Sequence, residues 1–172
     1  MVDYRRNKPD SPDTLFFLTI VTFERRKLFH LEKDFQYVKD EMIRVSKGYR
    51  VKFMAWVILS DHMHWLIKPG KANYSKVITS FKRGIGAEYK RRGIIQIGDK
   101  LWQDRFWEHT IRDDRDYSNC VDYIHFNPVK HGLATSPSEW KYSSFTKHVD
   151  KGLIESDWAK GDNIIIPGAE YD

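Results

Sequence analysis

The chain has 172 residues, 41% hydrophobic and 31% charged, which is the size and composition of one globular domain with its own core. A single cysteine, Cys120, excludes an intramolecular disulfide and a cysteine-based zinc cluster. The net charge of +5 favours a polyanionic partner, and no apolar run approaches the roughly 18 residues of a membrane span. With no signal peptide recognisable at the start, we expect a cytoplasmic protein without a membrane partner.

The first part of the chain alternates between strand and helix patterns. Residues 1–13 are polar, basic and contain two prolines, which indicates an N-terminal arm. Dense apolar residues predict strands over 15–23 and 51–59, and a third strand over 62–68 that a Pro-Gly pair ends. Between the first two strands, apolar residues at steps of three and four predict an amphipathic helix that ends near Gly48.

The second part begins with a predicted helix over 74–91, whose middle is weakened by Gly84 and Gly86. A fourth strand is predicted over 106–112, followed by a helix over 114–127 that Pro128 terminates.

This order predicts an α+β fold: a ferredoxin-like split βαβ antiparallel sheet with an added C-terminal helix. We place the domain at residues 14–132 and expect residues 133–172 to form a wrapping segment and tail.

The first candidate site is His62-Met63-His64 in the third predicted strand. Side chains alternate along a strand, so His62 and His64 share one face with alpha carbons about 6–7 Å apart. Two imidazoles at this spacing can bind one metal ion. The alternative, which the bare His-x-His pattern by itself favours, is two histidines on a solvated sheet face. Asp61, just before it, is interpreted as a turn residue rather than as a partner of the histidines.

The second candidate site is formed by Tyr123 and Asn127 in the last predicted helix. Four positions apart, they lie one turn apart on the same helix face, beside the buried stripe that includes Cys120 and Ile124. A tyrosine hydroxyl can attack a phosphate, and an amide oxygen can ligate a metal. The alternative is a rim tyrosine and an asparagine that merely precedes the helix end.

Longer motifs surround both sites and run from the first residues to about residue 160. They are Tyr4-Arg5-Arg6, Ala55-Trp56-Val57-Ile58-Leu59, His62-Met63-His64, Trp102-Gln103-Asp104-Arg105-Phe106-Trp107-Glu108-His109, the run from Asp122 to Gly132, Trp140-Lys141-Tyr142-Ser143-Ser144-Phe145 and Asp157-Trp158. A His-hydrophobic-His strand followed about sixty residues later by a helical tyrosine resembles the single-tyrosine HUH transposases. The full set more closely resembles the REP-associated tyrosine transposases, bacterial relatives of the enzymes of small single-strand insertion sequences.

This resemblance implies a role for each candidate residue. His62 and His64 match the metal ligands, Tyr123 the nucleophile, and Asn127 the third ligand, where some relatives have the longer glutamine or histidine. The implied metal is Mg²⁺ or Mn²⁺, although two imidazoles alone would equally suit zinc. The implied activity is that of a transposase and endonuclease which cleaves and rejoins single-stranded or hairpin, REP-like DNA through a covalent 5′-phosphotyrosine, as a monomer or homodimer.

Basic residues cluster in the arm and along the second predicted helix. We predict that they contact DNA phosphates, and the alternative is a solvated helix face. They are Arg5, Arg6, Lys82, Arg83, Lys90, Arg91 and Arg92. Three aromatic residues before and at the start of the fourth strand, Trp102, Phe106 and Trp107, are more typical of a core than of platforms for stacked bases.

Two other functions remain open from the residues alone. One is a non-catalytic nucleic-acid-binding module on a ferredoxin-like sheet, which would need no metal at His62 and His64. The other is a metal phosphodiesterase in which water attacks in place of Tyr123 and no covalent adduct forms.

Overall fold

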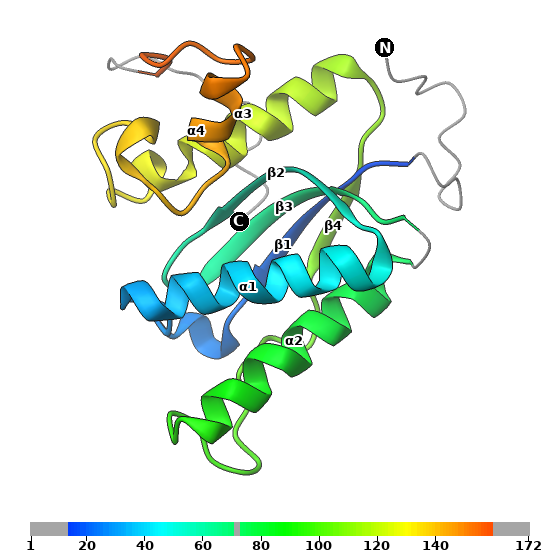
Figure 1. Ribbon diagram of the computed structural model, residues 1–172, viewed down its shortest axis with the longest axis vertical. Helices are drawn as coiled ribbons and strands as arrows, with labels where there is room; N and C mark the ends of the chain where they lie inside the picture. Colours follow the sequence, from blue (N-terminus) through cyan, green and yellow to red (C-terminus); the bar gives the residue numbers. More distant parts are fainter. Residues whose placement is uncertain (1–13, 71–72, 160–172) are drawn as a thin grey trace.

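The computed structural model describes residues 14–70 and 73–159, which form an antiparallel sheet with helices on both of its faces (Figure 1). The strand order is β2-β3-β1-β4. The strands are β1 (Phe16–Val21), β2 (Lys52–Ile58), β3 (His62–Lys68) and β4 (Trp107–Thr110). The helices are α1 (Glu32–Tyr49), α2 (Tyr74–Arg91), α3 (Asp114–Lys130) and α4 (Phe145–Asp150), with short 3-10 turns at Phe23–Arg25 and Pro137–Glu139.

Alternation along the strands gives the sheet two different faces. On β1, Leu18 and Ile20 belong to the larger hydrophobic core beneath α1 and α2, while Phe17 belongs to a second core beneath α3. Figure 1 shows the same division, with α1 and α2 on one side of the sheet and α3 and α4 on the other. The predicted α+β architecture, with its added C-terminal helix, is confirmed.

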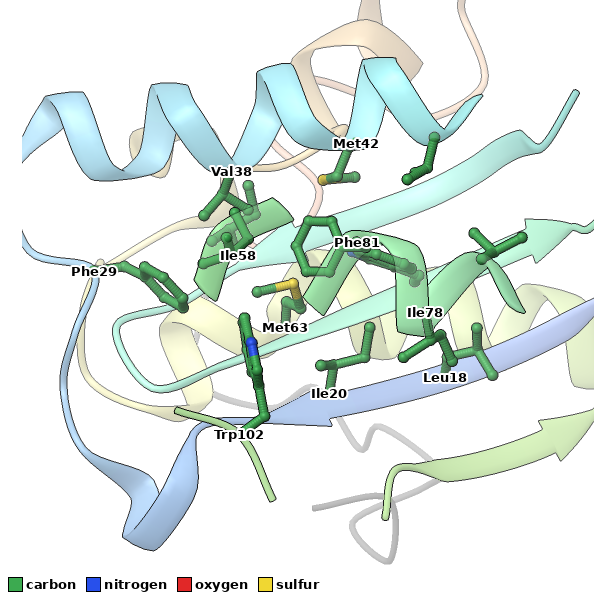
Figure 2. Packing of buried hydrophobic residues seen from close by; sticks show 14 of the residues in the cluster. Leu18, Ile20, Phe29, Val38, Met42, Ile58, Met63, Ile78, Phe81 and Trp102 are labelled. Atoms are coloured by element: carbon green, nitrogen blue, oxygen red, sulfur yellow. The ribbon is translucent and has the colours of Figure 1, made fainter. Parts of the chain in front are cut away.

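The larger core closes because both connecting helices present apolar stripes to one sheet face. Val38 and Met42 project from α1 and meet Ile78 and Phe81 of α2 above the strands (Figure 2). Trp102 closes the end of this core and is only 8% exposed. The face below α1 and α2 is therefore filled by side chains and serves stability.

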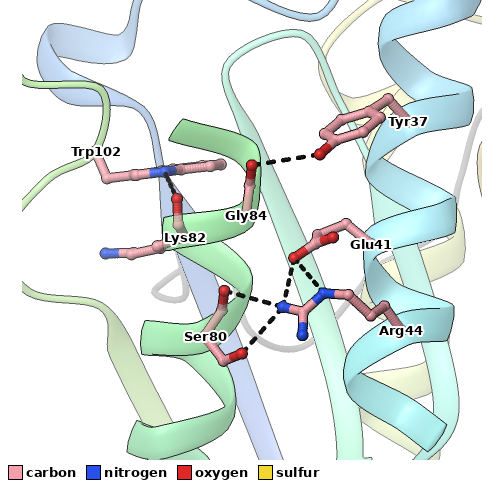
Figure 3. A network of polar contacts seen from close by, with 7 residues as sticks. All are labelled: Tyr37, Glu41, Arg44, Ser80, Lys82, Gly84 and Trp102. Atoms are coloured by element: carbon pink, nitrogen blue, oxygen red, sulfur yellow. Dashed lines mark hydrogen bonds and ion pairs between the residues drawn. The ribbon is translucent and has the colours of Figure 1, made fainter. Parts of the chain in front are cut away.

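The contact between α1 and α2 depends on a glycine. Glu41 is buried and accepts hydrogen bonds from Nε and Nη2 of Arg44, at 2.9 and 2.6 Å, and Arg44 also bonds Ser80 on α2 (Figure 3). A Cβ atom at Gly84 would overlap the Glu41 carboxylate, whereas one at Gly86 would meet nothing within 4 Å. Helix α2 runs unbroken through both glycines. Only at position 84 does the packing require a glycine.

We expect Gly84→Ala and Gly86→Ala to change stability in opposite directions. Gly86→Ala raises the free energy of unfolding by up to about 1 kcal/mol, because alanine loses less backbone entropy in a helix. Gly84→Ala lowers it, because Glu41 is buried and pinned by Arg44 and cannot yield without strain. Urea denaturation of both variants measures the difference, and equal stabilisation by the two would contradict this account of the α1–α2 contact.

Helix α3 does not end where the sequence predicted. It continues through Pro128 to Lys130, because a proline in the last turn removes only one backbone hydrogen bond. The turn is held by the His131 backbone N–H, which donates to the Asn127 carbonyl at 3.0 Å. Gly132, with φ of 66°, then ends it in the left-handed conformation. The longer helix brings Lys130 and His131 toward the sheet.

The segment after α3 packs across β2 and α1. Tyr142 stacks on Phe35 of α1 with ring centroids 3.8 Å apart, and Trp140 donates to the Ile58 carbonyl at 3.0 Å. The proposed domain limits at residues 13 and 132 remain predictions, and residues 1–13 and 160–172 lie outside the described residues. Within the part of the chain that is described, no helix is long and apolar enough to cross a membrane.

Candidate active site

His62 and His64 lie together on the α3 side of β3. Their ring centroids are 5.0 Å apart, and the side chains are 1% and 0% exposed. The shared face predicted from strand alternation is therefore present. A solvated sheet face, the alternative that the sequence left open, is wrong, because α3 covers this part of the sheet.

Each histidine is oriented by a hydrogen bond at Nδ1. Nδ1 of His62 lies 2.6 Å from a carboxylate oxygen of Asp61, and Nδ1 of His64 lies 2.9 Å from the hydroxyl of Thr19. A carboxylate only accepts, so Nδ1 of a neutral His62 carries the proton and Nε2 offers its lone pair. Such outer hydrogen bonds are typical of metal-binding histidines.

Asp61 is thus more than the turn residue that the sequence indicated. Burial acts to raise the pKa of its carboxyl, but the hydrogen bond with His62, aided by the charge of Arg25, brings the pKa below its ordinary value. The carboxylate therefore stays ionised and holds the ring of His62 in place.

Tyr123 lies on α3 directly against the histidines. Its ring centroid is 5.2 Å from that of His64 and 5.8 Å from that of Phe17, and the residue is 2% exposed. Lys130 donates from Nζ to the Tyr123 hydroxyl at 3.3 Å and places its ammonium 4.9 Å from the ring centroid. A positive charge at this position offsets negative charge that develops on the phenolic oxygen.

Asn127 lies one helical turn after Tyr123 and is fully buried. Neither its Oδ1 nor its Nδ2 has a hydrogen-bond partner among the described residues, and the same holds for Nε2 of His62. Leaving a buried polar atom without a partner costs about 1–3 kcal/mol, so a ligand that bonds these atoms would stabilise the site. Two imidazole nitrogens and an amide oxygen are suitable donors for a divalent metal ion, and the residues present therefore fit one.

Lys130 and His131 were not predicted as site residues. The ring centroid of His131 is 4.9 Å from that of His62, and the ring centroid of Tyr123 is 5.2 Å from that of His64. Asn127 is four residues after Tyr123 and four before His131, so it lies between these two contacts. The signal was present as the spacing of four between Asn127 and His131. It was hidden because Pro128 was expected to end the helix.

A second group of potential ligands lies nearby, at His109, Asp116 and Cys120, whose ligand atoms are all within 4.8 Å of one another. Asp116 is already engaged, since its carboxylate accepts from the Arg112 backbone N–H at 2.8 Å and lies 2.9 Å from Nε2 of His109. Burial, with a smaller contribution from Asp116, raises the pKa of the Cys120 thiol to about 12, which disfavours the thiolate that a metal needs. The pair His62 and His64 with Asn127 is therefore the better candidate for a metal site.

The basic residues of α2 lie on the other side of the sheet from Tyr123 (Figure 1). Three have internal partners: Lys82 donates to the Gln103 carbonyl at 2.8 Å, Arg91 pairs with Glu88 at 2.6 Å, and Arg92 pairs with Asp34 at 2.7 Å. Lys90 and Arg83 are exposed, and Arg83 lines a cavity of about 530 Å³ between α1 and α2. Arg5 and Arg6 lie outside the described residues.

Comparison with known proteins places this arrangement in a family. Residues 14–127 match the family of IS200-like transposases. A REP-associated tyrosine transposase of Escherichia coli (strain K12) is 36% identical over 162 residues, which are 92% of each chain. A putative REP-associated tyrosine transposase of Haemophilus influenzae (strain ATCC 51907 / DSM 11121 / KW20 / Rd) is 34% identical over 179 residues, covering 98% of this chain and 99% of the relative.

Solved structures agree with the sequence relatives. A REP-associated tyrosine transposase bound to a REP hairpin superposes with a TM-score of 0.72 at 31% identity, over 88% of this chain and 93% of that one. A putative transposase from Deinococcus radiodurans shares the fold, with a TM-score of 0.50 at 15% identity over 64% of this chain and 87% of that one. Fold and sequence thus define a transposase of the IS200-like class. The chain belongs to the REP-associated tyrosine transposases, as the motifs predicted.

The fit of Asn127 to a metal leads to a prediction about stability. Asn127→Leu replaces both unpartnered polar atoms with methyl groups on the same branched skeleton, so we expect the metal-free protein to gain about 1 kcal/mol of unfolding free energy. We expect Mn²⁺ to raise the melting temperature of the wild type, and the same change should abolish that rise. Asn119→Leu, a half-buried position on the same helix, should leave that rise intact. A less stable Asn127→Leu protein that still responds to Mn²⁺ would contradict the ligand role.

Proposed function

We propose that this chain cleaves and rejoins single-stranded or hairpin DNA through a covalent 5′-phosphotyrosine at Tyr123. The observation that carries the proposal is the position of the Tyr123 ring, 5.2 Å from the His64 ring, with the Lys130 ammonium 3.3 Å from its hydroxyl. The REP hairpin bound to the structural relative supports the choice of substrate.

The reaction exchanges one phosphoester bond for another. As the bond between the Tyr123 oxygen and phosphorus forms, the bond from phosphorus to the 3′ oxygen breaks, and the phenolic proton passes overall to the departing 3′ oxygen through solvent. Lys130 offsets the charge on the tyrosine oxygen during attack and again when that oxygen leaves in the reverse reaction. Because the link retains the energy of the broken bond, rejoining needs no nucleotide cofactor.

Three residues would hold the metal. His62, His64 and Asn127 would bind Mg²⁺ or Mn²⁺, whose chemistry there is to offset charge on a non-bridging phosphate oxygen. The hydrogen bonds that the two imidazoles make with Asp61 and Thr19 hold both rings in orientation before DNA arrives. The same preorganisation applies to Tyr123, whose ring is held between Phe17 and His64.

Lys130 also affects how a DNA phosphate can reach the Tyr123 hydroxyl. Tyr123 is 2% exposed, whereas Lys130 is an exposed residue whose amine covers the tyrosine hydroxyl. A phosphate can approach the hydroxyl when the flexible lysine side chain moves from the phenol to the phosphate itself. Lys130 would then bind the incoming DNA with the same charge that it places beside Tyr123.

The decisive experiment is Tyr123→Phe. The phenylalanine keeps the ring contacts with Phe17 and His64 and loses only the hydroxyl, so the variant should fold and bind hairpin DNA. It should cut nothing and form no denaturant-resistant adduct with labelled hairpin DNA and Mn²⁺ in gel electrophoresis. Tyr117→Phe, at a half-buried position on the same helix, serves as the control and should retain both activities. Cleavage without an adduct would favour the water-using phosphodiesterase.

The predicted DNA contacts outside the active site can be tested at two residues without disturbing the core. We propose that Arg83 and Lys90 bind phosphates together with Arg5 and Arg6 of the arm. Replacing Arg83 and Lys90 with glutamine should weaken binding of all sequences and reduce the slope of log affinity against log salt by roughly 0.7 per lost single-strand contact. An unchanged slope in fluorescence-anisotropy titrations would assign this helix face to solvent.

A further inference from the structure

Trp107 differs from the other aromatic residues of its region. Trp102 is 8% exposed and donates to the Lys82 carbonyl, and Phe106 packs against the larger core. Trp107, at the start of β4, is 39% exposed and belongs to neither hydrophobic core. The expectation of a core residue therefore holds for its neighbours but is wrong for Trp107.

The exposed indole is nevertheless held rigidly. It stacks on His109, two residues along the same strand, at 5.9 Å and 19°, and its ring meets Phe17 at 5.8 Å and 76°. His109 is fixed in turn, since its Nε2 lies 2.9 Å from both carboxylate oxygens of Asp116 on α3. A planar aromatic ring that is both exposed and immobilised loses little conformational entropy when a second ring stacks on it.

Trp107 is also aligned with the active site. In the sheet register Trp107 pairs with Thr19, and Thr19 pairs with His64, so the three residues form one row across β4, β1 and β3. Paired residues share a sheet face, which places Trp107 on the face of α3 and Tyr123, about 10 Å from His64 by two strand spacings. Phe17 touches Trp107, His64 and Tyr123 at once.

We propose that Trp107 is a stacking platform for one base of the single-stranded DNA next to the scissile phosphate. The proposal rests on the function proposed above and adds a subsite to it. A nucleobase is the occupant favoured by the surroundings, because two exposed cations that suit the phosphates of the same strand belong to the same set of contacts. Arg112 pairs with Asp116, which holds the His109 ring under Trp107, and Lys130 bonds the Tyr123 hydroxyl. Stacking accepts every base, so this subsite positions the strand without reading its sequence.

Substitutions at Trp107 separate stacking from mere apolar contact. The assay measures affinity for a fluorescent hairpin oligonucleotide with a single-stranded flank, without metal and in the Tyr123→Phe background, so that no cleavage occurs. Trp107→Ala and Trp107→Leu should each weaken binding by about 5- to 150-fold, while Trp107→Phe should retain most of the affinity. Melting temperatures of all variants provide the check on folding.

A series of abasic flanks tests the same contact without relying on a substitution. The parent protein should lose affinity when one particular base next to the cut site is removed, and Trp107→Phe should respond at the same position. Trp107→Ala should bind the intact and the abasic flank equally, because the platform is already gone.

The outcomes distinguish this subsite from the proposed function. Normal DNA binding by Trp107→Leu, or no sensitivity of the parent to any abasic position, overturns the platform and leaves the function standing. Failure of the parent protein to bind the hairpin at all overturns both. A dimer that dissociates on Trp107→Ala substitution, with unchanged DNA affinity, would make Trp107 a contact between two copies and would likewise overturn the platform.

Discussion

The packing of α3 on the sheet is the constraint on which the rest of the structure depends. At one end of the contact Cys120 and Ile124 of α3 belong to the same hydrophobic cluster as Phe17 and Leu66, and this apolar contact anchors the helix. Farther along, the same strands present Thr19, His62 and His64 to the same helix. The apolar end thus holds the helix at a fixed distance from the sheet at the polar end, where Tyr123 and the candidate metal ligands meet.

The arrangement places polar groups where they are costly. His62 and Asn127 are buried with side-chain atoms that bond no described residue, whereas most buried polar atoms in proteins are satisfied. A chain selected for stability alone would fill these positions with apolar side chains. Unpartnered polar atoms at these positions favour a site that a ligand completes, and they are the residues for which the family resemblance implies metal ligands.

Much of the fold follows from the sequence, because periodicity specifies faces. The bounds of β3 and α2 are those predicted, and alternation correctly put His62 and His64 on one side. Periodicity indicates which side chains share a face of the sheet, but not which helix covers that face. The burial of His62 and His64 under α3 was therefore not predicted. Pro128 misled in the same way, since a proline in the last turn removes only one backbone hydrogen bond and the helix continues through it to Lys130. Trp107 was misjudged because an aromatic residue beside apolar neighbours is typical of a core, whereas its exposure depends on the packing around the β4 edge.

The division of charge between the two sheet faces limits how DNA can bind. On α2, Lys82, Arg91 and Arg92 are bonded to the protein itself, so a net charge of +5 does not locate the nucleic acid. A strand that touched both α2 and Tyr123 would have to pass around one edge of the sheet. The β2 edge is covered, because Ser144 donates to the Trp56 carbonyl and Ile58 donates to the Tyr142 carbonyl. Among the described residues no segment extends the sheet beyond β4. Of the two lateral edges, the β4 edge, at which Trp107 lies, is thus the one around which a DNA strand in contact with both faces would pass.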